Sequence, residues 1–575
     1  MSDFKLEIAK LLSGQITCLT QDDIYSMLEV PANTDMGDYA FPCFKLAKEL
    51  RKAPPMIAKD IVDAIGEVSF LSKVENVNAY INFFVDKTML VKSVLDNVLT
   101  AKENYGLAQA HDKGNVVIDY SSPNIAKPFH VGHLRSTVIG HSLYRIFEAL
   151  GYNCVGVNHL GDWGTQFGKL IVAYKNYSSK EEVEEKGISE LLRIYVLFHD
   201  EAEKNPELEQ EARDYFTRME QGDEESLALW SWFKEISLKE FERVYEMLGV
   251  TFDSYNGEAF YNDKMAAIIE ELEAKGLIEV SEGAKLVRLD EENMAPCLIT
   301  KKDGSSLYAT RDITAAEYRK KTYDFKKCIY VTALQQNLHF AQWFKVIDKM
   351  GYDWAKDLVH VPFGMVSMES GSLSTRKGNV LFLEDILKEA VNKTRQVIEE
   401  KNPDLPNKEE VAMQVGIGAV IFDDMYNNII KDIQFSWERV LNFDGETGPY
   451  VQYTHARACS VLRKANVEVN HSFSDIDYTV LTDDASVNVI KELADFNSVI
   501  EEAANKYEPS YIARYAVDLA QAFNKFYHDN AILVEDEKVK EARLAIVLSV
   551  KYVLSNALYL LGIKSPEQLS LIHIW

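Results

Sequence analysis

The sequence lacks the features that would mark a membrane protein, a disulfide-rich secreted protein or a zinc protein. Its six cysteines are scattered singly through 575 residues, with no C-x-x-C pair and no H-E-x-x-H motif. No run of 18 or more residues is uninterruptedly apolar, and the start MSDFKLEIAKLLSGQ is neither a signal core nor an arginine-rich transit pattern. We therefore expect a cytoplasmic protein with free thiols, no membrane association and no metal held by its side chains.

Positive charge is also scarce, which argues at first sight against a nucleic-acid partner. The chain has 62 Lys and Arg against 89 Asp and Glu, a net charge of −27, whereas phosphate binding draws mainly on Lys and Arg. The deficit is concentrated, because residues 181–225 hold 16 acidic and 5 basic side chains. Four lysines lie at helical spacing around a Pro-Pro pair: Lys45, Lys48, Lys52 and Lys59. They fit either a face exposed to solvent or a basic binding face.

What is present is the composition of an ordinary globular protein with several domains. Hydrophobic residues make up 47% and charged residues 26% of the chain, and a chain of 575 residues suggests about three to four folding units. We expect a small mixed α/β unit over residues 1–108, an α/β core over 109–384, a helical connection over 385–445 and an all-α unit over 446–575.

The core pattern is strand, loop, helix, strand. NVVIDY (115–120) is a short buried strand, a Ser/Pro/Asn loop follows, and HLRSTVIGHSLYRIFEALG (133–151) has helical periodicity and ends at a glycine. The next strand is NCVGVNHLGD, so the unit is β-α-β and predicts a parallel sheet. The acidic region of about 178–300 breaks the alternation and reads as an insertion, after which KCIYVTALQQNLHF resumes the pattern.

Two histidines stand at the start of the predicted helix. His130, Gly132 and His133 follow a loop that leaves the carboxyl end of a parallel strand, the place where doubly wound sheets bind nucleotides. Three residues apart, the imidazoles can share one face and donate N–H groups to phosphate, and a glycine between them lets a ligand approach the backbone. This arrangement favours charge stabilisation in phosphoryl or nucleotidyl transfer, without a nucleophile.

A second loop and the H-x-G-H sequence together carry a family resemblance. SGSLSTRKGNVL (370–381) and the H-x-G-H sequence resemble the two signatures of class I aminoacyl-tRNA synthetases. Five segments in order resemble the arginyl-tRNA synthetase family in particular, and the likeness extends over nearly the whole chain: SSPNIAKPFHVGHLRSTVIG, NHLGDWGTQFGKL, LYATRDITAAEYR, QQNLHFAQWF and TGPYVQYTHARA.

The resemblance implies a fold and a reaction. The fold is a Rossmann-type catalytic core, an N-terminal domain that contacts the tRNA elbow, and a helical C-terminal anticodon-binding domain. In the reaction, the carboxylate of L-arginine attacks the α-phosphate of ATP, pyrophosphate leaves with Mg²⁺, and the aminoacyl group passes to the terminal ribose of tRNA(Arg). The chain would act as a monomer, and positioning and charge stabilisation would dominate catalysis.

The resemblance also implies three sets of site residues. The catalytic residues are Lys127, His130 and His133. The ATP-binding residues are Phe129, Gly132, His159, Arg376, Lys377 and Gly378, with the 376–377 loop closing over the nucleotide. The arginine-binding residues are Asp119, Ser121, Asn124, Tyr308, Asp312 and Gln336, with Asp119 and Asn124 toward the backbone end of the amino acid.

The chain departs from the family pattern in two places. Ser372 and Thr375 occupy the positions of the signature lysines, so Lys127 is expected to stand in for them, with help from Arg376 or Lys377. The ending LSLIHIW is unlike the usual end of these chains.

Other interpretations remain open from the sequence alone. An H-x-G-H nucleotidyltransferase without RNA and an inactive, RNA-binding paralogue are alternative functions. GDWG reads as a structural turn, His141 as structural, His159 as either a core residue or an adenosine contact, and GPYVQYTHAR as either a base-stacking surface or internal packing. Asp312 either supplies the carboxylate that binds the arginine side chain or merely caps the N-terminus of a helix ITAAEYRKK.

Overall fold

The computed structural model describes residues 4–31, 33–127, 129–302, 307–368, 382–468, 471–473 and 475–569. The chain forms two compact units, which we describe separately. The first comprises residues 1–105, 458–496 and 518–553, and the second comprises residues 106–457, 497–517 and 554–575.

The first unit contains a small α/β domain at the N-terminus. Its antiparallel sheet has the order β1-β3-β2, and Ile8, Phe41 and Phe83 pack in its core. Pro54 and Pro55 open a new helix, so Lys45, Lys48, Lys52 and Lys59 do not lie on one continuous helix. The elements are α1 (Phe4–Ser13), α2 (Gln21–Met27), β1 (Tyr39–Pro42), α3 (Leu46–Leu50), α4 (Pro54–Ala64), β2 (Leu71–Val77), β3 (Tyr80–Val85) and α5 (Lys87–Ala101).

The second unit is built on a four-stranded parallel sheet of order β10-β9-β4-β5. The helix between β4 and β5 confirms the predicted β-α-β unit, and the parallel α/β core is confirmed with it. Asp119 pairs in register with Val157 and Tyr330, so β4 and β5 end together while β9 runs on to Ala333 in the same direction. The elements are β4 (Asn115–Asp119), α6 (Val131–Ala149), β5 (Asn153–Val157), β9 (Phe325–Ala333), α14 (Asn337–Lys349) and β10 (Leu358–Phe363).

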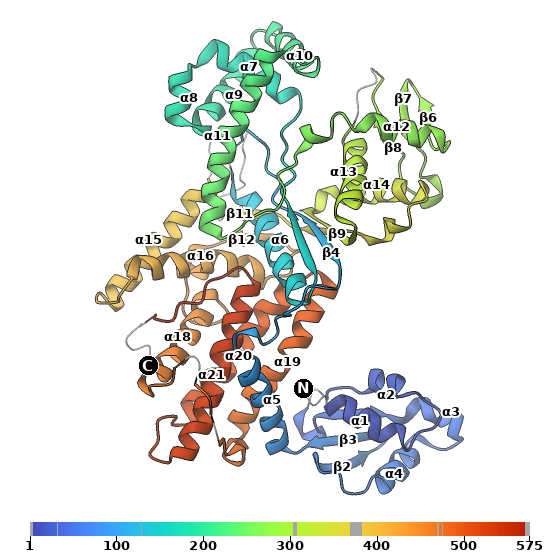
Figure 1. Ribbon diagram of the computed structural model, residues 1–575, viewed down its shortest axis with the longest axis vertical. Helices are drawn as coiled ribbons and strands as arrows, with labels where there is room; N and C mark the ends of the chain where they lie inside the picture. Colours follow the sequence, from blue (N-terminus) through green and yellow to red (C-terminus); the bar gives the residue numbers. More distant parts are fainter. Residues whose placement is uncertain are drawn as a thin grey trace. The chain divides into compact units, whose positions relative to one another are not determined.

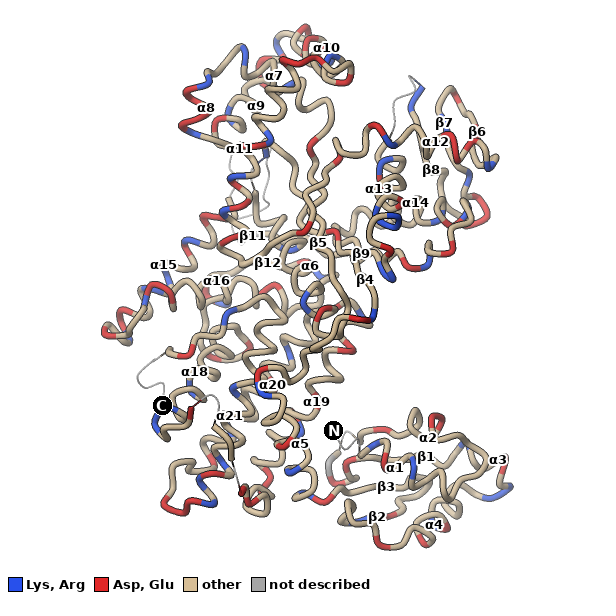
Figure 2. Tube along the Cα trace, in the orientation of Figure 1, with Lys and Arg blue, Asp and Glu red and all other residues tan. Residues whose placement is uncertain are grey.

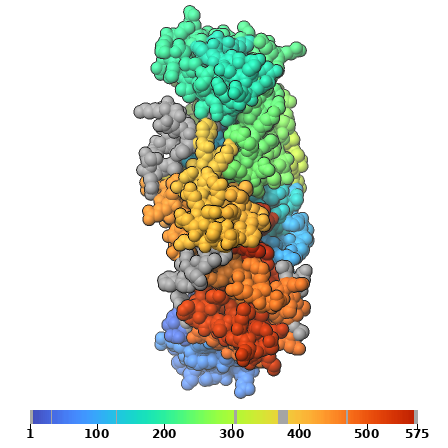
Figure 3. All heavy atoms as spheres, turned by 90° about the vertical axis from the view of Figure 1, so that its left-hand side faces the viewer, coloured from blue at the N-terminus to red at the C-terminus, as the bar shows by residue number. Residues whose placement is uncertain are grey.

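The segment between β5 and β9 forms helices and a small antiparallel sheet. The helices α7 to α11 group together (Figure 1), and in the space-filling view of Figure 3 their atoms, teal to green, form a continuous body. Acidic and basic residues are interspersed along them (Figure 2), and Lys169–Glu209 and Lys175–Glu225 pair at 2.7 Å. Part of the acidic excess is therefore neutralised within this region. The elements are α7 (Thr165–Tyr177), α8 (Lys180–Lys186), α9 (Ile188–Ala202), α10 (Glu207–Glu220), α11 (Glu224–Leu248), α12 (Met265–Ala274), β6 (Glu279–Ser281), β7 (Ala284–Val287) and β8 (Cys297–Thr300).

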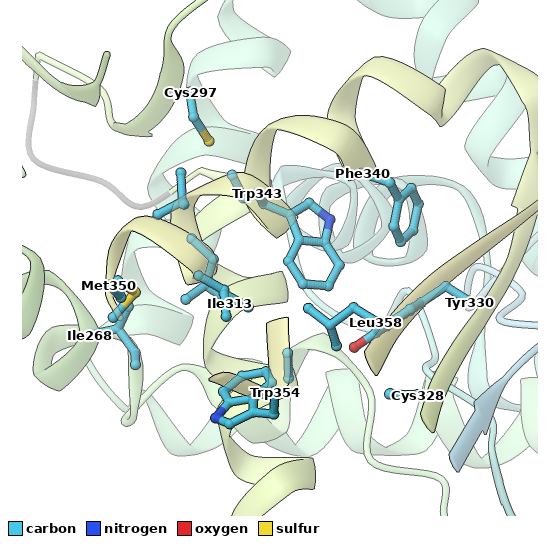
Figure 4. Close-up of a cluster of buried hydrophobic side chains, with 14 of the residues drawn as sticks. Ile268, Cys297, Ile313, Cys328, Tyr330, Phe340, Trp343, Met350, Trp354 and Leu358 are labelled. Atoms are coloured by element: carbon cyan, nitrogen blue, oxygen red, sulfur yellow. The ribbon is translucent and has the colours of Figure 1, made fainter. Parts of the chain in front are cut away.

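One hydrophobic cluster joins the sheet to two helices that follow the insertion. It brings together Ile313 of α13 (Tyr308–Tyr323), Phe340 and Trp343 of α14, Tyr330 of β9 and Cys297 of β8 (Figure 4). Because these side chains are almost fully buried, the helices α13 and α14 hold a fixed position against the strand ends.

The rest of the chain is mainly helical, as the periodicity predicts. The elements are β11 (Val366–Met368), α15 (Leu383–Lys401), α16 (Lys408–Tyr426), β12 (Ile433–Phe435), α17 (Trp437–Val440), α18 (Gly448–Lys464), α19 (Asp484–Lys506), α20 (Ser510–Asp529) and α21 (Glu537–Leu560). In the described ranges α21 alone is long and apolar enough to cross a membrane, and 78% of its most apolar window is buried, as in a core helix. Lys551 interrupts the apolar sequence of α21.

Candidate active site

The loop between β4 and α6 is held in an unusual backbone conformation. Ser121, Ser122 and Ala126 have positive φ angles of 70°, 49° and 59°, a region that non-glycine residues seldom adopt. Side-chain acceptors fix all three amides: Ser136 Oγ, Asn158 Oδ1 and Ser237 Oγ, at 2.9, 3.2 and 2.9 Å. Such fixed strain is typical of ligand-binding loops.

His130 and His133 form a reciprocal cap at the first turn of α6. His130 is the N-cap residue, and its Nδ1 accepts the N–H of Gly132 at 3.0 Å, while its own N–H donates to His133 Nδ1 at 3.2 Å. The helix therefore begins at Val131, two residues before the predicted start. A Cβ on Gly132 would lie 2.8 Å from the His130 ring, so the ring itself requires a glycine here.

The same hydrogen bonds determine where the histidine protons lie. Each Nδ1 accepts a backbone N–H, so in the neutral ring the proton is on Nε2. Burial and Lys127 lower the pKa of His130. Burial, His130 and Lys127 lower the pKa of His133 to about 3. Both imidazoles are therefore neutral near pH 7 and keep an Nε2–H donor, and the exposed Lys127 is close enough to influence both.

Segments on both sides of the 369–381 sequence approach this helix start. Leu383 N–H donates to Phe129 O at 2.8 Å, and His130 forms an antiparallel bridge with Phe382. On the other side, Gly364, just before β11, accepts from Arg135 Nη1 at 2.9 Å. The predicted ATP-binding residues in between, Arg376, Lys377 and Gly378, lie outside the described residues.

Arg135 is a buried cation in α6. Its Nε donates to Asp424 Oδ1 at 3.0 Å, and its Nη1 also donates to Lys431 O at 2.8 Å. Burial raises the pKa of Asp424 to about 6, although Arg135 opposes the shift. The pair ties the H-x-G-H helix to α16 and to the approach of β11.

Asp119, predicted for the amino-acid backbone, is buried and paired within the protein. Arg319 Nη2 lies 2.7 Å from its Oδ2, and Ser122 Oγ donates to its Oδ1 at 2.9 Å. Arg319 Nη2 also lies 3.4 Å from His159 Nδ1, and burial lowers the pKa of His159. Arg319 thus contacts residues at the ends of both β4 and β5, and no pattern in the sequence predicts this contact.

Ser121 and Asn124, also predicted to bind arginine, have different surroundings. The hydroxyl of Ser121 bonds to Tyr245 OH at 2.7 Å and to Thr137 Oγ1 at 2.8 Å. Asn124 is exposed and bridges to Gly161, where an added Cβ would lie 2.2 Å from its Oδ1. Asn124 is therefore open to a ligand, whereas the Ser121 side chain is engaged in the protein.

The predicted guanidinium residues lie on α13 and beside α14. Tyr308 is the first residue of α13 and is 69% exposed, and Gln336 is exposed just before α14. Tyr308 and Asp312 are both in this helix, one turn apart. The capping alternative for Asp312 is wrong, because the N-cap is Leu307, which makes no side-chain cap. Asp312 Oδ2 instead lies 2.5 Å from His339 Nε2.

Glu258 is a second carboxyl group that interacts with Asp312, and no motif in the sequence points to it. It lies in a short 3₁₀ turn after α11, and its Oε1 is 3.6 Å from Arg311 Nη1. Burial raises the pKa of Glu258 to about 7, with Arg311 opposing and Asp312 and Asp162 adding to the rise. Two interacting acidic groups, Glu258 and Asp312, therefore lie at the first turns of α13, which begins at the exposed Tyr308, and carboxylates with an aromatic ring are suited to a planar cation.

Residues with structural alternatives can now be placed. Asp162 is fully buried, pairs with Lys234 at 2.6 Å and accepts the N–H of Ala259 at 2.9 Å, so GDWG is a structural turn. His141 is buried against Gly562. His455 is buried, with its Nδ1 3.1 Å from Pro566 O, which favours internal packing for that histidine. In the described ranges, no three His, Cys, Asp or Glu residues come together as metal ligands.

Comparison with known families finds three domain matches along the chain. Residues 3–85 match the arginyl tRNA synthetase N terminal domain, residues 94–437 the class I (R) tRNA synthetase catalytic domain, and residues 451–569 the DALR anticodon binding domain. The match to the catalytic domain covers the H-x-G-H helix, α13 and α14.

Relatives and solved structures agree with these matches. The arginine–tRNA ligases of Alkaliphilus metalliredigens and Clostridioides difficile are each 57% identical over 569 residues, which is 99% of this chain and 100% of theirs. The arginyl-tRNA synthetase structure from Thermus thermophilus aligns with a TM-score of 0.81 at 25% identity, covering 99% of this chain and 100% of that one. With this agreement over the full length, the chain belongs to the arginyl-tRNA synthetase family of class I aminoacyl-tRNA synthetases.

Proposed function

We propose that the chain is an arginine–tRNA ligase that activates L-arginine with ATP and transfers it to tRNA(Arg). A carboxylate oxygen of arginine attacks the α-phosphorus of ATP, and the bond to the β-phosphate oxygen breaks to release pyrophosphate. A ribose hydroxyl at the 3′ end of the tRNA then attacks the arginyl carbonyl, and AMP leaves. ATP enters as its Mg²⁺ complex.

The observation that carries this proposal is the pairing of two different sites at one sheet edge. The H-x-G-H cap follows β4. The two carboxyl groups of Asp312 and Glu258 interact at the start of α13. The ion pair between Arg319 and Asp119 joins α13 to the end of β4. A phosphate site and a guanidinium site next to each other fit a reaction that joins ATP to arginine.

In the phosphate half, the neutral histidines act as donors. The Nε2–H groups of His130 and His133 stabilise charge on the phosphates and the leaving pyrophosphate. Lys127 adds a mobile ammonium that replaces the missing signature lysines, with Arg376, Lys377 and Gly378 on the second loop. Phe129 stacks on His133, with ring centroids 5.1 Å apart, and so orients that ring.

In the arginine half, charge and shape select the side chain. Asp312 and Glu258 accept from the guanidinium, Tyr308 packs against its plane, and Gln336 adds an acceptor. Asp119 and Asn124 bind toward the amino-acid backbone, Ser121 shapes the loop between them, and His159 contacts the adenosine.

The remaining parts of the chain bind the RNA. Residues 1–108 contact the tRNA elbow, and residues 446–575 bind the anticodon. Residues 109–384 form the catalytic domain with its insertion at about 178–300. Residues 385–445 connect the catalytic domain to the anticodon-binding domain. The enzyme acts in the cytoplasm as a monomer. An H-x-G-H enzyme without RNA would have no use for an anticodon-binding domain, and an inactive paralogue would be expected to lose His130 or His133.

Pyrophosphate exchange tests this function. We expect exchange of labelled pyrophosphate into ATP that requires arginine and occurs only with tRNA bound, because Ser372 and Thr375 replace the two signature lysines of the second loop. Comparable exchange with and without tRNA would refute the tRNA requirement, and exchange driven by another amino acid would refute the assignment.

A further inference from the structure

We propose that His339 is a positioning residue for arginine selection, because it holds the carboxylate of Asp312 in the orientation that receives the guanidinium. The inference rests on the proposed function. Its observation is the contact of 2.5 Å between His339 Nε2 and Asp312 Oδ2, which joins the third residue of α14 to the fifth residue of α13.

The backbone around this pair is rigid. Ile313, next to Asp312, and Phe340, next to His339, are only 1% and 5% exposed and belong to the same hydrophobic cluster (Figure 4). Packing of these neighbours fixes the two helices, so the distance between the polar side chains is set by the core. His339 and Asp312 lie at the edge of that core, with side chains 30% and 27% exposed, so a ligand can still reach them.

The chemistry of the contact assigns a role to each oxygen of Asp312. An ionised carboxylate has no proton, so His339 Nε2 is the donor and Oδ2 the acceptor. Within the described parts of the chain, Oδ1 accepts no hydrogen bond from the protein. One oxygen is therefore engaged and the other is free for the substrate, and the carboxylate cannot rotate without breaking the bond to His339.

A fixed acceptor binds a planar donor group better than a rotating one. A guanidinium donates in a rigid fork, and aligning the carboxylate beforehand removes the rotational entropy that binding would otherwise lose. His339 does not touch the guanidinium. It acts through Asp312, so its loss should weaken arginine binding and leave ATP binding unchanged.

The test compares variants with and without the donor. His339→Phe keeps a ring and removes the N–H, His339→Leu is a second donor-free variant, and His339→Gln keeps an amide N–H near the position of Nε2. His111→Phe is the matched control, because His111 also bonds through a ring nitrogen, at 3.1 Å to Tyr152 O, but lies on neither α13 nor α14. Arginine Kd is measured by calorimetry on the full chain, with KM for arginine and ATP and a thermal melt.

We expect both donor-free variants to weaken arginine binding about tenfold, which corresponds to 1.4 kcal/mol, with KM for ATP unchanged. His339→Gln should remain within about threefold of the parent, and His111→Phe should match it. In an Asp312→Asn background, loss of His339 should add no comparable effect.

Three results would overturn the inference. They are an unchanged arginine Kd in either donor-free variant, equal losses in His339→Phe and His339→Gln, or an equal loss of ATP affinity. If the parent protein itself fails to bind arginine, the proposed function fails instead, so the two failures are distinguishable.

Discussion

Replacing Asp312 with Asn tests whether this carboxylate binds the arginine side chain or only joins the helices α13 and α14. The side chain is 27% exposed and its Oδ2 is engaged by His339. Asn has a single acceptor oxygen, so either its NH₂ faces the guanidinium donors or it faces the His339 donor. A hydrogen bond to a charged group contributes about 1.5–3 kcal/mol, so losing the charge and one acceptor should cost about 3 kcal/mol of arginine binding.

This magnitude sets the expected kinetics. At tenfold per 1.4 kcal/mol, KM for arginine should rise at least about a hundredfold, and KM for ATP should change little. The free energy of unfolding should fall by no more than the contribution of one neutral hydrogen bond, about 0.5–1.5 kcal/mol. Steady-state aminoacylation against arginine and ATP, with a thermal melt, measures all three quantities.

Asp324→Asn is the matched control. Asp324 lies at the C-cap of the same helix, is 84% exposed, and pairs only with Lys320 in the described structure, so its removal should leave both KM values unchanged. A destabilised Asp312→Asn protein with a normal KM for arginine would refute the reasoning and make Asp312 a structural tie between α13 and α14.

Three further predictions concern the phosphate site and the stability of the fold. Lys127→Ala should lower kcat for activation by about 10² or more, the effect of one preorganised electrostatic donor, and Lys377→Ala by less; equal effects in single-turnover assays would refute the stand-in role. Arg135→Met should lower the free energy of unfolding by about 3–5 kcal/mol because it leaves Asp424 buried without its partner, and urea denaturation that shows under 1 kcal/mol would contradict this. Burial and Arg145 lower the pKa of His141 to about 3, so the folded protein excludes a proton that the unfolded chain binds below its pKa of about 6.5. Stability should therefore fall as the pH falls from 6.5, and His141→Gln should flatten that slope by up to about 1.4 kcal/mol per pH unit between pH 6 and 4; parallel slopes for parent and variant would refute it.

Local pattern was enough to predict the core of the fold. The apolar run 115–120, the periodicity of 133–151 and the following strand predict a parallel β-α-β unit, and the structure confirms it as β4, α6 and β5. The helix starts earlier than predicted because a histidine side chain caps it, and histidine is not a usual capping residue. The family resemblance is likewise confirmed by the matches along the whole chain.

Contacts between distant residues could not be predicted in the same way. Glu258, Arg319 and His339 lie far from their partners in sequence, and no periodicity relates them. The capping interpretation of Asp312 failed because α13 begins at Leu307–Tyr308 without a Ser, Thr, Asp or Asn cap, so the sequence carries no start signal there. The roles of the predicted site residues stay predictions that the variants above can test.

The most direct test of the central claim is aminoacylation of total tRNA with each of the twenty amino acids in turn. We expect that arginine alone is attached, in an ATP-dependent reaction, and that the charged tRNA is tRNA(Arg). Charging with a different amino acid, or no charging with any of the twenty by a folded protein, would contradict it.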